Sequence, residues 1–274
     1  MRYQVALWGL PADEPLQAVR VELIRRSVPH VVIDQRDRCH PVELDAIGAL
    51  FVRVCETAPL QRHLFAWADV AECFVMNRPS TMWSNWTKPL QAELICSHGF
   101  AVPATLVTTT PDDVREFVTQ YARVVYTAVC GHRCVVSRLD RADFDHLADV
   151  ATCPTQFQEF VPGVDWRVHV VGDAVFACEI RCDADDYRLA HVAGEKVELR
   201  SAALPDSIAA RCRTLTRELG LSLAGIDLRR TENDVWYCFE VNTAPGFTFF
   251  EPVAQPVAAA VAELLANACM EAAA

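Results

Sequence analysis

The chain has 274 residues, 52% of them hydrophobic and 22% charged, and its formal net charge is −11 at pH 7. This composition excludes a disordered chain and is enough for one large domain, or two to three small ones, with a sizeable core. The sequence has no basic run and no interleaved aromatic and basic residues, which argues against general nucleic-acid binding. Nucleotides are not excluded, because they reach acidic proteins together with Mg²⁺.

The twelve cysteines are expected to be reduced thiols of a cytoplasmic protein. The first eight residues read as a short strand rather than a signal peptide. We expect no apolar run as long as a membrane span of about 18–20 residues, and therefore no membrane partner. No CxxC pair occurs, which disfavours a zinc site. We expect mostly buried free thiols in apolar surroundings, such as those of Cys178, Cys238 and Cys269.

The N-terminal segment, residues 1–78, is predicted to be a small α/β domain. Its predicted elements are a strand at 3–8, a helix at 14–27, a strand at 30–34 and a helix at 60–75. The β-α-β start favours a parallel sheet. No GxGxxG motif follows the first strand, so a dinucleotide fingerprint is absent. The polar, proline-containing stretch 76–80 is the predicted first boundary.

Two further blocks are predicted, at residues 79–160 and 161–274. The first is predicted to contain a helix at 86–98, a strand at 105–108, a helix at 111–121, a strand at 124–129 that pairs back with 134–138, a helix at 141–150 and a strand at 156–161. The second is predicted to contain strands at 166–171 and 174–181, a helix near 205–219, a β-hairpin and a terminal helix from about 256. The last 110 residues therefore read as an antiparallel sheet with helices on one side. The predicted fold class is α/β in the broad sense: an α/β domain at the N-terminus is followed by α+β blocks.

The hairpin is the most informative stretch of the chain. Residues 222–230 and 235–242 read as strands, and the Thr-Glu-Asn-Asp sequence between them is typical of a turn. A turn centred between residues 233 and 234 sets Asp227 opposite Glu240, and the two-residue strand period puts Asn242 on the same face. The other face is predicted to carry Ile226, Leu228, Tyr237, Phe239 and Val241.

Two carboxylates that lie so close repel each other unless a cation sits between them. Mg²⁺ suits such a site, because it usually takes one or two carboxylates together with nucleotide phosphates. The alternative is an ordinary amphipathic hairpin with a solvated acidic face. The spacing alone leaves both interpretations open.

Several motifs in order along the chain resemble those of the ATP-grasp superfamily. They are Lys88-Pro89 at a helix start, Gln158-Glu159-Phe160-Val161, Gly163 to Arg167, Asp186-Tyr187-Arg188 and the acidic hairpin. The likeness is greatest to the branch of ribosomal-protein glutamate ligases and maturases of ribosomally made peptides, and it runs from about residue 77 onward. It implies an ATP-grasp fold with an N-terminal pre-ATP-grasp α/β domain (1–78), a central subdomain with a lid (79–160) and a C-terminal subdomain with the metal site (161–274).

The resemblance also implies an ATP site. Its implied Mg²⁺ ligands are Asp227, Glu240 and Asn242. Its implied nucleotide contacts are Lys88 at the phosphates, the backbone of the linker Gln158, Glu159, Phe160 and Val161 at the adenine, and Asp165 near the ribose. For the side chains of Phe160 and Val161, the alternative is plain strand core.

Two arginines match family arginines near the γ-phosphate and the acyl phosphate. They are Arg167 and Arg188, and a guanidinium can clamp a phosphoryl group with two hydrogen bonds. The alternative for each is a surface salt bridge. The strand period puts His169 on the same face as Arg167, and we expect a structural role for it.

The chain departs from the family pattern at the lid. The family's second phosphate-neutralising lysine would stand at Thr127, and residues 130–133 contain one glycine only. Arg133 is the nearest cation that can reach back to replace the lysine. Ala190 stands where the family usually has an asparagine.

The resemblance therefore implies an ATP- and Mg²⁺-dependent ligase that joins a carboxylate substrate to an amine acceptor through an acyl phosphate, with peptide or natural-product maturation as the expected setting. The alternative is a degenerate ATP-grasp protein that binds nucleotide or a peptide partner without ligation. A third interpretation is a scaffold that uses the same fold for protein–protein contact. The substrates and the oligomeric state are left open.

Overall fold

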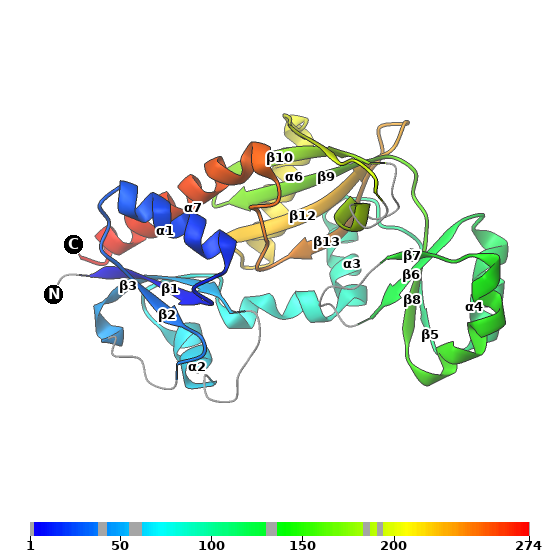
Figure 1. The fold of residues 1–274 in the computed structure, drawn as a ribbon, viewed down its shortest axis with the longest axis horizontal. Helices are drawn as coiled ribbons and strands as arrows, with labels where there is room; N and C mark the ends of the chain where they lie inside the picture. The colour runs from blue at the N-terminus through cyan, green and yellow to red at the C-terminus, as the bar shows by residue number, and fades with distance from the viewer. Residues whose placement is uncertain are drawn as a thin grey trace.

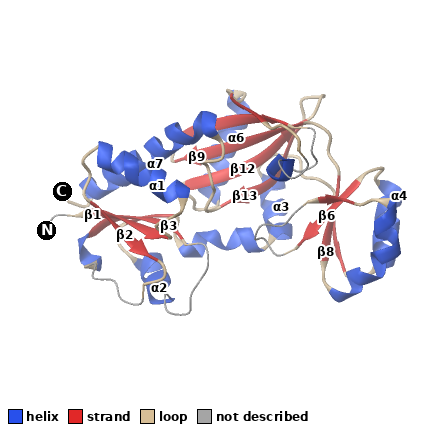
Figure 2. Cartoon of the chain, in the orientation of Figure 1, coloured by secondary structure: helices blue, strands red, loops and turns tan. Residues whose placement is uncertain are grey.

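A computed structural model describes the protein as three β-sheets with helices packed between and around them (Figure 1). The first sheet and the third lie next to each other, and the second sheet projects at the far end of the molecule (Figure 2). The described residues are 3–37, 43–54, 62–129, 136–182, 187–190 and 194–273.

The first sheet is parallel, as the β-α-β start predicted. Its strand order is β2 (His30–Asp34), β1 (Gln4–Gly9), β3 (Ile47–Arg53) and β4 (Phe74–Met76). Successive residues of β1 point to opposite faces, so Leu7 packs in one core and Trp8 in another. The cores on these two faces include residues of helices α1 (Glu14–Arg25) and α2 (Arg62–Val70), respectively.

Two of the predictions for this sheet are wrong. Strand β3 was not predicted, although all seven of its residues are buried. The predicted helix at 60–75 ends at Val70, and residues 74–76 form β4 instead. Both strands are short apolar runs, and parallel strands buried on both faces lack the alternation that identifies a strand in sequence.

The second sheet is antiparallel. Its order is β5 (Thr105–Thr108), β8 (Thr155–Glu159), β6 (Val124–Ala128) and β7 (Ser137–Arg138). Helix α4 (Pro111–Gln120) and a 3-10 segment (Arg141–Thr152), predicted as a helix at 141–150, cover one face around Val114, Leu147 and Phe157. Helix α3 (Lys88–Ser97) precedes this sheet in the chain and contacts strand β13 (Trp236–Asn242) of the third sheet.

The third sheet is also antiparallel. Its order is β11 (Glu198–Ser201), β10 (Ala174–Arg181), β9 (Val164–Val171), β12 (Leu223–Arg230) and β13 (Trp236–Asn242). The prediction that helices cover one side is wrong. Helix α6 (Asp206–Glu218) packs on one face, and α7 (Glu251–Glu271), which begins five residues before its predicted start, packs on the other (Figure 1). Strand β11 was not predicted.

Helix α7 joins the first and third sheets. It is long and apolar enough, by length and composition, to cross a membrane, so the expectation that no such run exists is wrong. Val257, Val261 and Leu265 are fully buried in a core that contains Leu7 of the first sheet and Ile180 of the third. The apolar side chains of α7 are therefore buried in the protein's own core.

The segment predicted as the first boundary is anchored rather than loose. The Asn77 side chain is buried, donates to the Leu223 and Thr243 carbonyls at 2.7 and 2.6 Å, and accepts from the Ser222 amide at 2.8 Å. Arg78 donates to four carbonyl groups around the end of α2. This segment therefore fixes the first sheet beside the third.

Candidate functional site

The predicted pairing of the acidic hairpin is confirmed. Asp227 on β12 lies directly opposite Glu240 on β13, and the Asn242 amide nitrogen is 3.3 Å from an Asp227 carboxylate oxygen. The register then shifts, because Leu228 pairs with Cys238. This bulge leaves Phe239 as the extra residue on β13.

The bulge corrects the predicted faces of β13. Ile226, Leu228 and Val241 lie in the apolar core, as predicted. Trp236 and Cys238 also lie there, whereas Phe239, which was predicted on the core side, lines a cleft beside Glu240. Strand alternation puts Tyr237 on the side of Phe239 as well.

The cleft lies between the second and third sheets and has a volume of about 330 Å³. It gathers most of the residues that the sequence analysis singled out: Lys88, Thr127, Gln158, Glu159, Phe160, Val161, Asp165, Arg188, Asp227, Glu240 and Asn242. Arg133 lies outside the described residues. Arg167 lies behind Asp227 and is not part of the lining.

Arg167 is a buried cation that pairs with Asp227. Its Nη1 atom lies 2.6 Å from Asp227 Oδ1 across the β9–β12 pairing, and the residue is 6% exposed. Burial, the largest single influence, would lower the pKa of Arg167, but Asp227 together with the neighbouring Tyr187 and Glu240 outweighs it and the pKa is raised. The surface-salt-bridge alternative is therefore wrong, and Arg167 orients one carboxylate of the pair.

Glu240 sits in a place that disfavours its charge. Burial, and then the Asp227 charge, raise the pKa of Glu240, and the positive charges of Lys88, Arg167 and Arg188 act in the opposite direction. The two carboxylates and the Asn242 amide oxygen form a hard-oxygen donor set that fits Mg²⁺. Among the described residues, no three His, Cys, Asp or Glu side chains cluster as metal ligands. Mg²⁺ that is bound through one or two carboxylates usually completes its shell with water and phosphate oxygens.

Helix α3 is positioned over this hairpin by one buried side chain. Gln91 donates to the Val241 carbonyl at 3.0 Å and accepts from the Val241 amide at 2.9 Å, like an added strand residue. Val241 stands between Glu240 and Asn242. Since Lys88 lies three residues before Gln91 on α3, the same helical face brings its amine toward the acid pair.

The linker between the sheets is held from both sides. The Glu159 side chain accepts from the Ala104 amide at 3.0 Å, and the backbone N–H groups of Glu159 and Phe160 donate to the carbonyls of Ala104 and Arg123. These two N–H groups are therefore already bonded within the protein and do not donate into the cleft. The Arg123 guanidinium lies 4.0 Å from the centre of the Phe160 ring, and Val161 is buried.

Arg229 is a cleft residue that the sequence analysis missed. It binds both carboxylate oxygens of Asp165, at 2.7 and 2.9 Å, and donates to the Val161 carbonyl at 2.8 Å. Its guanidinium lies 5.2 Å from the centre of the Phe239 ring. The signal was present, because Arg229 stands two residues after Asp227 and shares its face. The Asp165 carboxylate, implied as a ribose contact, is thus held by an arginine.

Tyr187 and Gln156 also line the cleft and were not predicted as site residues. Burial, and then the Asp227 charge, raise the pKa of Tyr187, so its hydroxyl is neutral. Its ring contacts Phe249 and Phe250. Gln156 pairs with Thr127 across the β6–β8 ladder.

His169 shares a face with Arg167, as predicted, and is fully buried. The two side chains are 3.4 Å apart, and the His169 ring packs edge-on against Phe247 and Phe250. Burial, and then the Arg167 charge, lower the pKa of His169 to about 3. The imidazole is therefore neutral and has a packing role.

This lowered pKa predicts acid sensitivity. Because the unfolded chain binds the His169 proton near pH 6.5, the free energy of unfolding should fall as pH decreases from 6.5 to about 3, by at most about 1.4 kcal/mol per pH unit. His169→Gln should remove this slope, whereas exposed His63→Gln should keep it. Chemical denaturation between pH 4 and pH 7 measures both, and equal slopes in wild type and His169→Gln would contradict the assignment.

Gly225 leaves the room that Arg167 needs. A Cβ atom at this position would lie 2.5 Å from Arg167 Nη2 and 2.5 Å from the Pro245 Cβ. Gly225→Ala should therefore displace Arg167 from Asp227 and destabilise the fold by about 1–3 kcal/mol. Gly246→Ala is the control, since a Cβ there meets no atom within 4 Å. Denaturant melts compare the two, and equal stability would show that the strand relaxes freely.

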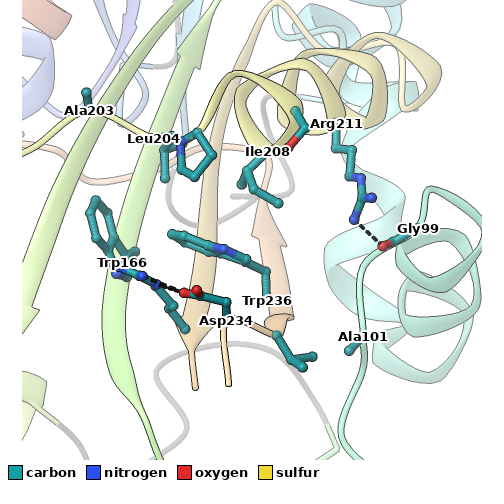
Figure 3. Close-up of a pocket in the computed structure, with 13 residues that line it drawn as sticks. Gly99, Ala101, Trp166, Ala203, Leu204, Ile208, Arg211, Asp234 and Trp236 are labelled. Atoms are coloured by element: carbon teal, nitrogen blue, oxygen red, sulfur yellow. Dashed lines mark hydrogen bonds and ion pairs between the residues drawn. The ribbon is translucent and has the colours of Figure 1, made fainter. Parts of the chain in front are cut away.

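A second cavity, of about 870 Å³, opens beside the start of α6 (Figure 3). Trp166 and Trp236 form one wall, with ring centres 5.4 Å apart. The charged groups around it already have partners: Arg230 binds Asp234 at 2.6 Å, and Arg211 donates to the Gly99 carbonyl at 2.6 Å. None of the predicted site residues lines it, so the cleft at the acidic hairpin is the candidate active site.

Solved structures with the same fold cover nearly the whole chain. The ATP-grasp ligase PsnB, complexed with a variant of its minimal precursor, Mg and ADP, has a TM-score of 0.83 at 21% identity, over 98% of this chain and 99% of that one. A RiPP-associated ATP-grasp ligase of Chryseobacterium gregarium, in complex with ADP and a leader and core peptide, has a TM-score of 0.82 at 18% identity, over 97% of each chain.

The macrocyclase MdnC of Microcystis aeruginosa, bound to the precursor peptide MdnA, has a TM-score of 0.80 at 19% identity, over 96% of this chain and 99% of that one. No curated protein matches the sequence significantly. At these identities the likeness establishes the ATP-grasp fold. The family model described as the RimK-like ATP-grasp domain matches residues 86–265, which include the linker, both arginines and the acidic hairpin. The chain therefore belongs to the RimK-like ATP-grasp family.

Proposed function

We propose that the protein is an ATP- and Mg²⁺-dependent ligase that joins a carboxylate to an amine through an acyl phosphate. The observation that carries this proposal is the facing pair Asp227 and Glu240, with Asn242 beside it, in a cleft that also receives Lys88 and Arg188. A scaffold without metal chemistry gains nothing from two carboxylates held together in a partly buried site.

The residues of the cleft divide the work. Asp227, Glu240 and Asn242 would hold Mg²⁺, which when bound would neutralise the phosphate oxygens and polarise the γ-phosphoryl group. Lys88 places a positive charge near Glu240, where it would offset the charge of the phosphates. Arg188, on the exposed side of the cleft, is placed to stabilise charge on the transferring phosphoryl group.

The reaction proceeds in two displacements. A substrate carboxylate oxygen attacks the γ-phosphorus of ATP, and ADP leaves. The amine then attacks the carbonyl carbon of the acyl phosphate, phosphate leaves, and one proton is released. Tyr187 lines the cleft with a neutral hydroxyl, and the neutral His169 lies buried behind Arg167, so neither side chain adds a charge beside the transferring phosphoryl group.

A peptide is the substrate that we propose, in the maturation of a peptide or a peptide-derived natural product. Three proteins with this fold were solved with precursor or leader and core peptides. The net charge of −11 disfavours a strongly acidic partner except where Arg188 receives a carboxylate. The carboxylate to be activated is thus expected on a peptide of otherwise neutral or basic character.

The alternative, a degenerate protein that binds nucleotide or peptide without ligation, is favoured by one observation. Thr127 stands where the family's second lysine is implied, so one phosphate-neutralising charge is lost. Calorimetric titration of ATP and ADP, with and without Mg²⁺, followed by an ADP-release assay with carboxylate and amine peptides, separates the possibilities. Mg²⁺-dependent binding with ADP release supports the ligase, and nucleotide binding without release supports the alternative. No nucleotide binding overturns the ligase and leaves only the peptide-binding form of the alternative.

A further inference from the structure

Two buried polar atoms in the cleft wall have no hydrogen-bond partner among the described residues. They are the Thr127 hydroxyl oxygen and the Gln156 side-chain carbonyl oxygen. Thr127 is 6% exposed and Gln156 is 4% exposed, and both residues line the cleft. They face each other as a cross-strand pair, Thr127 on β6 and Gln156 on β8.

Such a pair is unfavourable for stability alone. A buried hydroxyl or amide without a partner loses its bonds to water and gains nothing in return, whereas an apolar residue of the same shape would pack there without this cost. Local rules are broken in this way mostly where a ligand supplies the missing partners. The neighbouring Gln158, in contrast, donates to Thr105 at 2.9 Å.

The chemistry of the pair selects its partner. Neither side chain carries a charge, so the pair cannot neutralise a phosphate. The threonine hydroxyl can donate a hydrogen bond, and the glutamine carbonyl accepts one. Adenine offers the complementary edge, with an acceptor at N7 and a donor at the N6 amino group, whereas guanine offers two acceptors, at N7 and O6.

The surroundings fit a base rather than phosphates. Val125 on β6 and Val136 just before β7 are apolar lining residues of the same sheet as the pair, and Val161 and Phe239 add apolar surface elsewhere in the cleft. Lys88, Asp227 and Glu240 are contributed by α3 and the third sheet, whereas the charged lining residue on the strands of the pair, Glu159, already accepts from the Ala104 amide at 3.0 Å. The uncharged wall therefore takes the flat base, and the charged side takes the phosphates.

We propose that Thr127 and Gln156 form an adenine-selecting pair, in which the lost lysine is replaced by neutral recognition of the N7 and N6 edge. The inference rests on the proposed nucleotide-dependent function and adds to it the residues that determine which base is accepted. It also gives a reason for Thr127 that does not require loss of activity.

The test uses variants that keep shape but remove the polar atoms, Thr127→Val and Gln156→Met. Thr119→Val and Gln120→Met, at exposed positions on α4, are the matched controls. Calorimetric titration with ATP and with GTP, and thermal unfolding without ligand, are measured for each. We expect ATP affinity to fall at least tenfold in either variant, the preference for ATP over GTP to shrink, and the ligand-free melting temperature to stay or rise.

A structural role for the pair would instead lower the ligand-free melting temperature, because bonds within the protein would be lost. Unchanged ATP affinity in both variants, or an ATP-to-GTP preference equal to that of wild type, would overturn the inference while leaving the proposed function intact. Absence of ATP binding by the wild type would overturn the proposed function itself. The controls should match wild type in all three measurements.

Discussion

Glu240→Gln is expected to abolish Mg²⁺-dependent nucleotide binding and, at the same time, to stabilise the ligand-free protein. The glutamine keeps the shape of the side chain but removes one of the two facing negative charges, and Mg²⁺ is usually bound through one or two carboxylates. Burial and Asp227 raise the pKa of Glu240, so its ionised form is unfavourable in the folded protein when no cation is present. In the variant, the folded protein no longer buries a second negative charge beside Asp227, so its free energy of unfolding should increase.

The sign of the pH effect follows from proton binding. The pKa of Glu240 is higher in the folded protein than in the unfolded chain. Above about pH 4.5 the unfolded chain therefore releases this proton more readily than the folded protein does, and the free energy of unfolding decreases as pH rises. The gain from Glu240→Gln should therefore be larger at pH 8 than at pH 4. Denaturant melts at both values measure it, and calorimetry with ATP and Mg²⁺ measures binding.

Glu232→Gln is the matched control, because it changes an exposed residue in the turn of the same hairpin. It should leave binding and stability near those of wild type. Unchanged ATP affinity in Glu240→Gln would show that the facing carboxylates are structural, and the amphipathic-hairpin interpretation would then replace the metal site.

Asp227→Ala is expected to have the largest effect on stability. It leaves the Arg167 guanidinium buried without its carboxylate, and removing one partner of a buried ion pair costs about 3–5 kcal/mol. Because the Asp227 side chain is 27% exposed, we expect the low end of this range, about 3 kcal/mol. Urea melts of the ligand-free protein measure the loss.

The comparison that isolates the ion pair is the double variant Asp227→Leu with Arg167→Met, which replaces both charges by apolar groups. It should recover most of the loss, since neither charge is then left buried alone. Asp173→Ala removes the partner of Arg217 in an exposed pair and should cost about 1 kcal/mol or less. A loss in Asp227→Ala no greater than in Asp173→Ala would contradict a buried pair.

The elements that the sequence revealed are those with a clear period or clear boundaries. The strand at 105–108 and the opposition of Asp227 to Glu240 follow from the two-residue period and from turn residues. Strand β3 lacked such a signal, because it is buried on both faces and reads as a continuous apolar run. The covering of the third sheet by α7 depends on packing between segments far apart in the chain.

The site divides in the same way. Motif spacing gathered Lys88, Asp165 and Arg188 correctly into one cleft. It did not reveal that the bulge turns Phe239 toward the cleft, since one extra residue in a strand reverses every later side chain. It also could not distinguish Arg167, which lies behind a carboxylate, from an arginine that faces the ligand. Burial decides that difference, and burial is a property of the folded chain.

The first sheet is synthesised early, but it cannot be completed until the C-terminal helix α7 has been synthesised. Its β1 and β3 strands are made first, yet one face of that sheet packs against Val257, Val261 and Leu265 of helix α7, which are made about 200 residues later. On a ribosome, helix α1 covers only part of this face, and the part that α7 covers stays exposed until α7 emerges. A nascent chain arrested before residue 251 should therefore bind hydrophobic dyes or chaperones that recognise apolar surface. A stop codon at the same position would remove the α7 side chains that pack against the first sheet, although this sheet lies at the opposite end of the sequence.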